Sequence, residues 1–229
     1  MREVATALRE AGERLGVDRE AVLLLGRLVE LVAEDPLSPT AAADPKQVAG
    51  HVLDSLQGLT VAALRAARRL VDVGSGAGFP GLVLAAAKRE CAVTLLESNG
   101  EKAAFLLRLV GALGLENVAV VGERVELWRE GLETAEVVTA RAVGPQPVVV
   151  EYAAPLLEVG GHLVEWRTVR PQSERERGLK AASLLGLALV AELPYAPGDR
   201  RRLEVFRKER PTPERFPRRP GVARKRPLA

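Results

Sequence analysis

The sequence predicts an α/β fold: a mostly parallel, seven-stranded sheet with helices on both faces, preceded by an N-terminal helical extension. Two observations carry this prediction. From residue 69 onward, short apolar segments typical of strands alternate with segments of helical spacing, and this alternation is typical of a parallel sheet covered by helices. A glycine-rich turn follows the first strand and opens a helix, which is the context that a nucleotide-like ligand requires.

Residues 1–68 are expected to form the helical extension. Apolar residues recur at helical spacing between Leu23 and Val32. Two prolines in the segment 35–39 end this pattern, and Asp44-Pro45 begins another helix, because proline is tolerated in the first turn of a helix. The apolar stripe of this second helix consists of Val48, Val52, Leu56 and Leu59.

The sheet and its helices are expected to follow, up to residue 210. Seven strands are predicted, at residues 70–73, 92–96, 117–121, 137–140, 161–166, 187–193 and 202–206. Helices are predicted at residues 82–88 and 101–113. The last two strands come close together in the chain, so we expect them to form an antiparallel edge of the sheet.

The C-terminal residues 211–229 are predicted to form an extended arm, because prolines recur there and oppose regular structure. From residue 200 to the end there are 12 basic and 3 acidic residues, against 21 basic and 27 acidic residues in the rest of the chain. This asymmetry indicates either a contact with a polyanion or a solvated tail. The predicted parts are therefore an extension (1–68), a ligand-binding domain (69–210) and a basic arm (211–229).

Composition excludes several classes of protein. The single cysteine, Cys91, rules out a disulfide framework within the chain. The N-terminus lacks the apolar stretch and cleavage site of a secretory signal, and the longest apolar run, 181–191, is shorter than the ~20 residues that span a membrane. No Cys/His spacing suggests a metal site. We therefore expect a cytoplasmic monomer that contacts neither a membrane nor a metal.

The segment Asp72 to Gly81, which reads Asp-Val-Gly-Ser-Gly-Ala-Gly-Phe-Pro-Gly, is the strongest signal in the chain. Its glycines allow a tight turn and let a ligand approach the backbone. Pro80 suits the first turn of the following helix. The segment lies between a strand and a helix, and Glu97 ends the next strand. Together these features predict a ligand site at the turn.

The motif of this turn is compatible with two nucleotide-like ligands. Gly76, Gly78 and Gly81 satisfy the dinucleotide pattern, with Glu97 about 20 residues further on. The alternative begins at Asp72, whose carboxylate would repel a pyrophosphate but attract the sulfonium and amino groups of S-adenosyl-L-methionine. Asp72 therefore favours the methyl donor. Glu97 would then accept hydrogen bonds from both ribose hydroxyls, the other interpretation being an exposed charge at the end of a strand.

Four segments together resemble the family of ribosomal RNA small subunit methyltransferase G, also called glucose-inhibited division protein B. They are residues 51–56, 71–81, 140–143 and 211–221, in the order of that family. The resemblance covers nearly the whole chain. It implies a Rossmann-like class I methyltransferase fold with S-adenosyl-L-methionine as cofactor. It also implies N7-methylation of one guanine in a decoding-region loop, with 16S rRNA or a small-subunit ribosomal particle as partner.

The resemblance also implies the residues that contact the donor. They are Gly74, Gly76, Phe79, Glu97, Ser98, Val125, Glu126 and Arg141. Two segments depart from the family pattern. Residues 37–40 stand where the family has an Asn-Leu-Thr stretch, and Arg167-Thr168 stands where it has Lys-Gly.

The chemistry is consistent with the sparse set of reactive side chains. Guanine N7 has an in-plane lone pair, so it can attack a sulfonium methyl without first losing a proton. Such an enzyme needs aligned reactants but neither a general base nor a covalent nucleophile. The two histidines, His51 and His162, are far apart in the chain. We therefore predict no catalytic residue, and expect Arg141 either to position the donor or a phosphate or to form a structural ion pair.

Other interpretations stay open at this point. The chain could be an RNA-binding or ribosome-assembly protein with a vestigial donor pocket, or a nucleotide-dependent oxidoreductase. His51, Asp54 and Ser55, on one helix, either cover the mouth of the cleft or form a hydrogen-bonded helix-packing site. Phe216 either stacks on an RNA base or pins the arm to the body of the protein.

Overall fold

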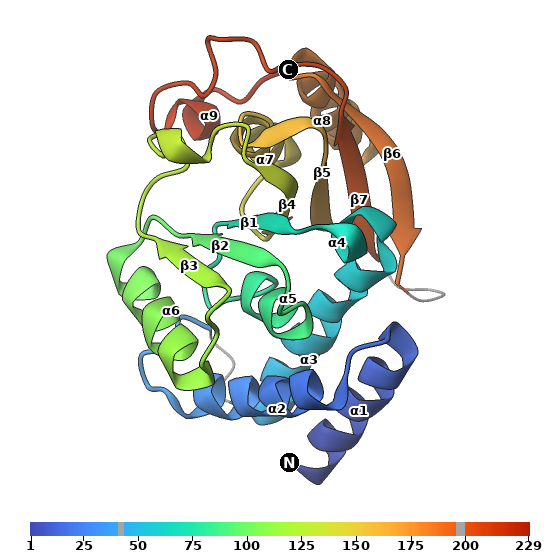
Figure 1. Ribbon diagram of the computed structural model, residues 1–229. Coiled ribbons are helices and arrows are strands. Elements are labelled where there is room, and N and C mark those ends of the chain that lie inside the picture. The colour runs from blue at the N-terminus through green and yellow to red at the C-terminus, as the bar shows by residue number, and fades with distance from the viewer. Residues whose placement is uncertain (41–43, 196–199) are drawn as a thin grey trace. The chain divides into compact units, whose positions relative to one another are not determined.

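The computed structural model describes residues 1–40, 44–195 and 200–229. Its sheet has seven strands in the order β3-β2-β1-β4-β5-β7-β6 (Figure 1). The pairs β1–β4, β2–β3 and β4–β5 are parallel, whereas β7 is antiparallel to both β5 and β6. The predicted α/β fold with a mostly parallel sheet is therefore confirmed. The antiparallel edge is also confirmed, and the order adds that β7 lies between β5 and β6.

The chain divides into two compact units. The first consists of residues 1–68 and 75–122, and the second of residues 69–74 and 123–229. The elements of the first unit are α1 (Arg2–Leu15), α2 (Arg19–Glu34), α3 (Pro45–Leu56), η1 (Gln57–Thr60), α4 (Ala62–Ala66), α5 (Gly81–Ala87), β2 (Ala92–Leu96), α6 (Gly100–Leu113) and β3 (Val118–Val121). Those of the second are β1 (Arg69–Val73), η2 (Arg129–Gly131), β4 (Ala135–Arg141), α7 (Gln146–Ala153), β5 (Leu157–Thr168), α8 (Gln172–Leu184), β6 (Leu187–Pro194), β7 (Arg201–Lys208) and α9 (Val222–Lys225).

Helix ends in the first unit follow local chemistry. The carboxylate of Asp18 accepts a hydrogen bond from the amide of Ala21 and caps α2, while Asp44 accepts from the amide of Lys46 and caps α3. Asn99 caps α6 in the same way. The cap at Asp44 agrees with the helix start predicted at Asp44-Pro45, whereas the caps at Asp18 and Asn99 were not predicted. Pro80 differs slightly from the prediction, because it is the N-cap of α5 and not a residue of its first turn.

The core of the first unit is formed by apolar faces of its helices. Val52 and Leu56 of α3, Val32 of α2 and Leu82 of α5 are fully buried. Each such side chain contributes roughly 1.5–3 kcal/mol when it leaves water. Helices α2 and α3 both contact α5, the helix that follows the glycine turn. The helical extension therefore supports the turn from within the same unit.

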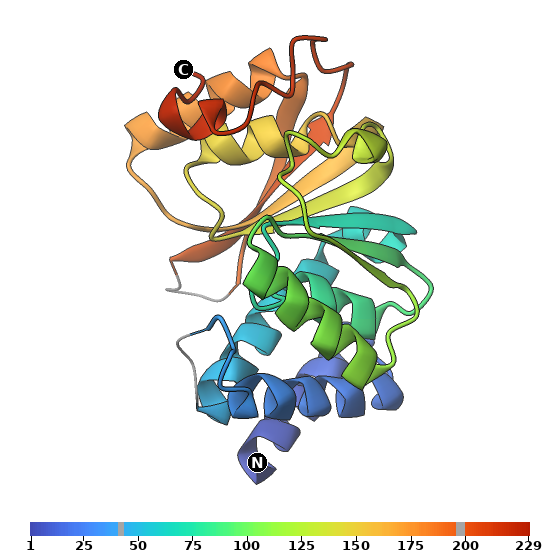
Figure 2. The same cartoon turned by 90° about the vertical axis from the view of Figure 1, so that its left-hand side faces the viewer.

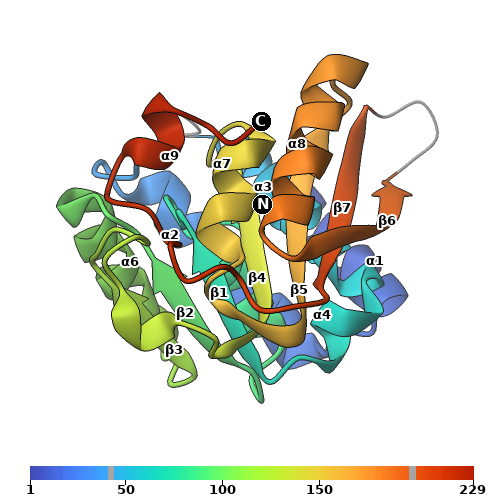
Figure 3. The same cartoon turned by 90° about the horizontal axis from the view of Figure 1, so that it is seen from above.

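The second unit places two helices on one face of its strands. Helices α7 and α8 contact each other and cover the strands β4, β5 and β7 (Figures 2 and 3). Val148 of α7, Leu163 of β5 and Phe206 of β7 are almost completely buried there. One row of directly paired residues crosses these strands: Val73 pairs with Ala140, Ala140 with Glu165 and Glu165 with Glu204. Two buried glutamates thus lie side by side in the sheet.

The C-terminal arm is attached to the second unit. Phe216 is buried, and Arg218 makes a bidentate ion pair with Glu151 of α7, with Nε 2.6 Å from Oε1. Residues 222–225 form the short helix α9, which contacts α7 (Figure 3). The prediction of a wholly extended arm was wrong for these residues, because the prolines flank this segment without entering it. Phe216 pins the arm to the unit.

Within the described residues, no helix is both long enough and apolar enough to cross a membrane.

Candidate functional site

The glycine turn in the first unit is held by its own backbone. The amide of Ser75 donates to the carbonyl of Leu96, the last residue of β2, at 3.3 Å. The amide of Gly78 then donates to the carbonyl of Ser75 at 2.7 Å, and the amide of Leu82 to the carbonyl of Gly78 at 2.8 Å. These bonds connect the end of β2, the turn and the start of α5. The turn is therefore a fixed structure.

Glu97 is part of this turn. Its Oε2 accepts a hydrogen bond from the amide of Gly76, and its Oε1 accepts one from the amide of Asn99, both at 2.9 Å. The side chain is buried, with 8% of its surface exposed. The interpretation of Glu97 as an exposed charge was wrong. Because each carboxylate oxygen can accept a second hydrogen bond, Glu97 keeps the capacity to bind a pair of hydroxyls.

Two positions in this segment require glycine. Gly78 has φ +96°, and a Cβ there would lie 2.9 Å from Cγ of Leu82 and closer still to its Cδ1. Gly74, at the end of β1 in the second unit, has φ +68°, and a Cβ would lie 3.0 Å from Cγ2 of Val143. Left-handed backbone of this kind disfavours any side chain. Gly74 and Gly78 are therefore dictated by backbone conformation and by space.

Phe79 lies in the same segment but is directed into the protein. It is buried, and its ring centroid lies 5.5 Å from that of His51 on α3. The hydroxyl of Ser55 donates to the carbonyl of His51 at 2.7 Å, within the same helix. His51 therefore contacts the glycine segment, whereas the hydroxyl of Ser55 is bonded within its own helix. Ser98, the neighbour of Glu97, is exposed.

The second unit contributes Asp72 from β1. Asp72 is completely buried, and its Oδ1 accepts a hydrogen bond from Oγ1 of Thr139 on β4 at 2.7 Å. Sequence reasoning missed Thr139, although it directly precedes the motif 140–143; only the pairing of Asp72 with Thr139 in the β1–β4 register reveals the contact. Arg141 is the last residue of β4 and is half-buried.

Val125 and Glu126 belong to the second unit and come after β3 in the chain. Both side chains are buried. Oε1 of Glu126 accepts a hydrogen bond from the amide of Gly221 at 2.8 Å, and its Oε2 lies 3.7 Å from Nε of Arg124. Glu126 therefore anchors the C-terminal arm. Of the predicted donor contacts, the structure joins Gly76 to Glu97 directly, while the carboxylate of Glu126 is engaged by the arm.

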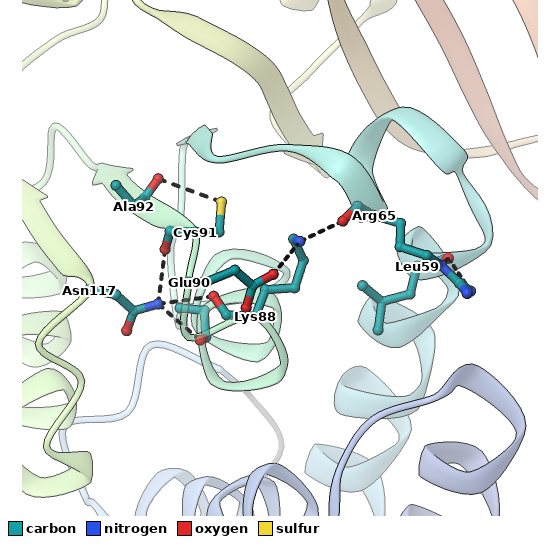
Figure 4. Close-up of polar contacts among 8 residues, drawn as sticks. Leu59, Arg65, Lys88, Glu90, Cys91, Ala92 and Asn117 are labelled. Carbon is teal, nitrogen blue, oxygen red and sulfur yellow. Dashed lines mark hydrogen bonds and ion pairs between the residues drawn. The ribbon is translucent and has the colours of Figure 1, made fainter.

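Cys91 lies at the other end of β2 from Glu97, as expected, since it precedes the strand that Glu97 follows. It is buried, with Sγ 3.8 Å from the carbonyl of Ala92. Nδ2 of Asn117 donates to the carbonyl of Cys91 at 3.0 Å, and Nζ of Lys88 donates to the carbonyl of Arg65 at 2.6 Å (Figure 4). Hydrogen bonds between side chains and backbone carbonyls therefore connect strands and helices at this end of the first unit.

The residues present suit S-adenosylmethionine. Glu97 offers two carboxylate oxygens beside a turn that has no side chain at Gly76 and Gly78. These oxygens suit the two ribose hydroxyls of that ligand. Among the described residues, no group of three or more His, Cys, Asp or Glu side chains is arranged to hold a metal ion.

Two solved structures that contain S-adenosylmethionine have a similar fold. The chain superposes on M. jannaschii TYW2 in complex with AdoMet with TM-score 0.54 and 20% identity, covering 69% of this chain and 76% of that one. It superposes on a 16S rRNA (adenine(1408)-N(1))-methyltransferase from Catenulisporales acidiphilia with cosubstrate SAM with TM-score 0.55 and 17% identity, covering 65% and 89%. The fold is therefore that of the class I methyltransferases.

Sequence relatives narrow this class to one family. Residues 34–195 match the family described as rRNA small subunit methyltransferase G. The ribosomal RNA small subunit methyltransferase G of Rubrobacter xylanophilus is 46% identical over 187 residues, which cover 78% of this chain and 72% of the relative. That of Pelotomaculum thermopropionicum is 36% identical over the whole of both chains. The chain belongs to the rRNA small subunit methyltransferase G family, which confirms the expected family and methyl donor.

Proposed function

We propose that this chain transfers the methyl group of S-adenosyl-L-methionine to N7 of a guanine in 16S ribosomal RNA, with the donor held at the glycine turn. Membership of the family and the names of its relatives support the reaction. The observation that carries the donor site is the carboxylate of Glu97, bound to the amides of Gly76 and Asn99 at the end of β2.

These contacts suggest the role of each residue in the proposed donor site. Glu97 accepts the ribose hydroxyls through the lone pairs that the two amides leave free. Gly74, Gly76 and Ser98 provide backbone that a ligand can approach. Asp72, buried against Thr139, supplies negative charge near the start of the turn. Phe79 and Val125 act as buried supports, because neither is exposed.

Catalysis in this proposal depends on position and not on proton transfer. The donor supplies an electrophilic methyl when it is bound. The chain aligns that methyl with a guanine N7, which already carries a lone pair, so no residue has to remove a proton. Arg141 orients the donor or an RNA phosphate, and Glu126 fixes the arm through Gly221. We place the enzyme in the cytoplasm as a monomer acting on 16S rRNA or a small-subunit particle.

Mass spectrometry of 16S rRNA tests this proposal. Small-subunit particles and free rRNA from cells that lack this protein are incubated with the purified chain and S-adenosylmethionine. The expected result is one added methyl on one guanine, released as 7-methylguanosine after digestion. Methylation of another base or atom would overturn the assigned chemistry. Binding of RNA without methylation and without heat on donor titration would identify an RNA-binding protein with a vestigial pocket.

A second titration tests the identity of the ligand. S-adenosylhomocysteine should displace the donor from the wild-type chain, whereas a nicotinamide dinucleotide should not. Displacement by the dinucleotide alone would support the oxidoreductase interpretation. Glu97→Ala should lose donor binding and keep most of its RNA affinity, and the opposite pattern would move the donor site elsewhere.

A further inference from the structure

The second unit contains an arginine-lined cavity that none of the site residues above explains. Its volume is about 250 Å³. It is lined by Gln146, Arg167, Val169, Arg170, Gln172, Glu174, Arg175, Arg202 and Glu204. These residues come from the start of α7, the end of β5, the start of α8 and strand β7. We call it the arginine cavity.

Its arginines are held in place by carboxylates. Nη2 of Arg175 lies 2.6 Å from Oε2 of Glu192, and Nη1 of Arg202 lies 2.9 Å from Oε1 of the same glutamate. Nη1 of Arg170 lies 2.9 Å from Oε2 of Glu174. Each contact engages one nitrogen, and a guanidinium carries five N–H donors. The three groups are therefore oriented but keep donors for a ligand.

The floor of the cavity is built from buried polar groups. Nε2 of Gln146 donates to Oε2 of Glu165 at 2.8 Å and also to Oε2 of Glu204. Nη1 of Arg167 donates to the carbonyl of Gly144 at 3.1 Å and lies 3.5 Å from Oε1 of Glu165. Gln146, Arg167 and Glu204 all have less than a tenth of their surface exposed. Side chains fixed in this way make a preformed wall.

The charges of the lining favour an anion. Four arginines line the cavity against two glutamates, Glu174 and Glu204, while Glu165 and Glu192 pair with three of these arginines from outside the lining. Helix α8 adds to this field, because its first turn, with Gln172 and Glu174, borders the cavity and the N-terminus of a helix carries partial positive charge. No side chain caps that N-terminus. A group with several acceptor oxygens would satisfy the remaining donors.

Phosphate is the anion that fits these donors, since arginine binds it through two parallel hydrogen bonds. Two sources supply a phosphate: the backbone of RNA and a free phosphate or nucleotide. The half-exposed positions of Arg170 and Arg175, with side chains 42% and 40% exposed, favour a long polymer passing over the cavity.

We propose that the arginine cavity binds a backbone phosphate of the RNA substrate, with Arg170, Arg175 and Arg202 as its donors. The inference rests on the proposed function, because it assigns a contact to the same RNA. It extends that function by placing one phosphate contact at the end of β5 and the start of α8, apart from the basic C-terminal arm.

The test uses the double variant Arg175→Ala/Arg202→Ala and a control on the same helix. Arg177→Ala is that control, because Arg177 lies on α8, does not line the cavity, and its Nε contacts the carbonyl of Ala229. Affinity for a 16S rRNA substrate is measured over a series of salt concentrations. Each lost phosphate contact lowers the slope of log affinity against log salt by about 0.7–0.9. We expect the double variant to bind about 5–20-fold more weakly, with a slope lower by about one.

Three comparisons decide the outcome. An equal slope for the double variant and Arg177→Ala, at equal thermal stability, would overturn the proposal. Donor binding measured by calorimetry should be unchanged in both variants, so a loss of donor binding would also count against it. Millimolar inorganic phosphate or a nucleoside monophosphate should weaken RNA binding only slightly. If phosphate or the nucleotide instead binds tightly and removes the salt-dependent contribution of Arg175 and Arg202 to RNA binding, the cavity is a small-molecule site and its assignment to RNA fails.

Failure of the cavity assignment can be distinguished from failure of the proposed methyltransferase function. If the wild-type chain methylates no guanine, the proposed function fails whatever the salt series shows. If the wild type methylates the rRNA and the double variant keeps both affinity and slope, only the assignment of the cavity fails. Arg170→Ala provides an independent check, because its surface pair with Glu174 contributes little to stability, and we expect it to weaken RNA binding about 2–5-fold.

Discussion

The backbone amide of Gly76 donates to Oε2 of Glu97 at 2.9 Å, so the glycine turn and the end of β2 are one hydrogen-bonded structure. In the proposed donor site, the carboxylate of Glu97 both fixes the turn and binds the donor, so one group has two roles. Its replacement should therefore affect donor binding more than a surface charge would.

Glu97→Gln should weaken donor binding about 10–100-fold. The amide nitrogen of glutamine cannot accept a bond from a backbone amide, and the lost hydrogen bond to a charged group is worth about 1.5–3 kcal/mol. Isothermal calorimetry with S-adenosylmethionine measures the change. Glu101→Gln, an exposed position in the first turn of α6, is the matched control and should bind like the wild type. Equal affinity of the two variants would contradict the role of Glu97.

Gly78→Ala should lower the thermal midpoint by about 5–10 °C. The residue has φ +96°, and its new Cβ would clash with Leu82. Left-handed backbone and overpacking together cost about 2–4 kcal/mol, and a chain of this size loses about 2–4 °C per kcal/mol. Gly50→Ala serves as the control, since a Cβ on that exposed turn of α3 meets no atom within 4 Å. That variant should be as stable as the wild type or gain up to about 1 kcal/mol.

Arg218→Ala should destabilise the second unit by about 2–4 kcal/mol. Glu151 has 1% of its surface exposed, and removing its bidentate partner leaves a buried carboxylate without a counter-charge. Arg219→Ala, at the exposed neighbouring position, should change stability by less than about 0.5 kcal/mol. Differential scanning calorimetry of both variants measures this, and limited proteolysis should cleave the arm faster in Arg218→Ala. Two identical profiles would show that the arm is not held by this pair.

Glu165→Gln should change how stability depends on pH. Burial raises the pKa of Glu165 from 4.5 to about 7, and the neighbouring Arg167 opposes that rise. A carboxyl whose folded pKa is raised stabilises the fold below its unfolded pKa, and this contribution is lost as the pH rises through the folded pKa. The loss falls between about pH 4.5 and 7 and is on the order of 3 kcal/mol.

Thermal unfolding at pH 5 and pH 8 checks this sign. The wild type should lose stability across that range because Oε1 of Glu165 is buried without a hydrogen-bond partner and must carry charge at the higher pH. The neutral glutamine avoids that cost, so the variant should be the more stable protein at pH 8. A variant that loses as much stability as the wild type between the two pH values would locate the ionisation elsewhere.

Much of the fold could be predicted from local patterns. Strand β2 has the predicted bounds, 92–96, and α6 begins one residue before the predicted 101–113. Periodic apolar residues and helix caps carry this information, because they depend on neighbours a few residues apart. The glycine turn and Glu97 were identified in the same way, since both directly follow predicted strands.

Tertiary structure decided what lies far apart in the chain. Local sequence does not show that Thr139 bonds Asp72, that Gly221 bonds Glu126, or that β7 inserts between β5 and β6. The basic tail illustrates the limit best, because its composition left open a polyanion contact or a solvated tail, whereas in the structure Arg218 pairs with the buried Glu151. Periodicity and capping specify each element, but partners separated by tens of residues meet only when packing brings their strands and helices together.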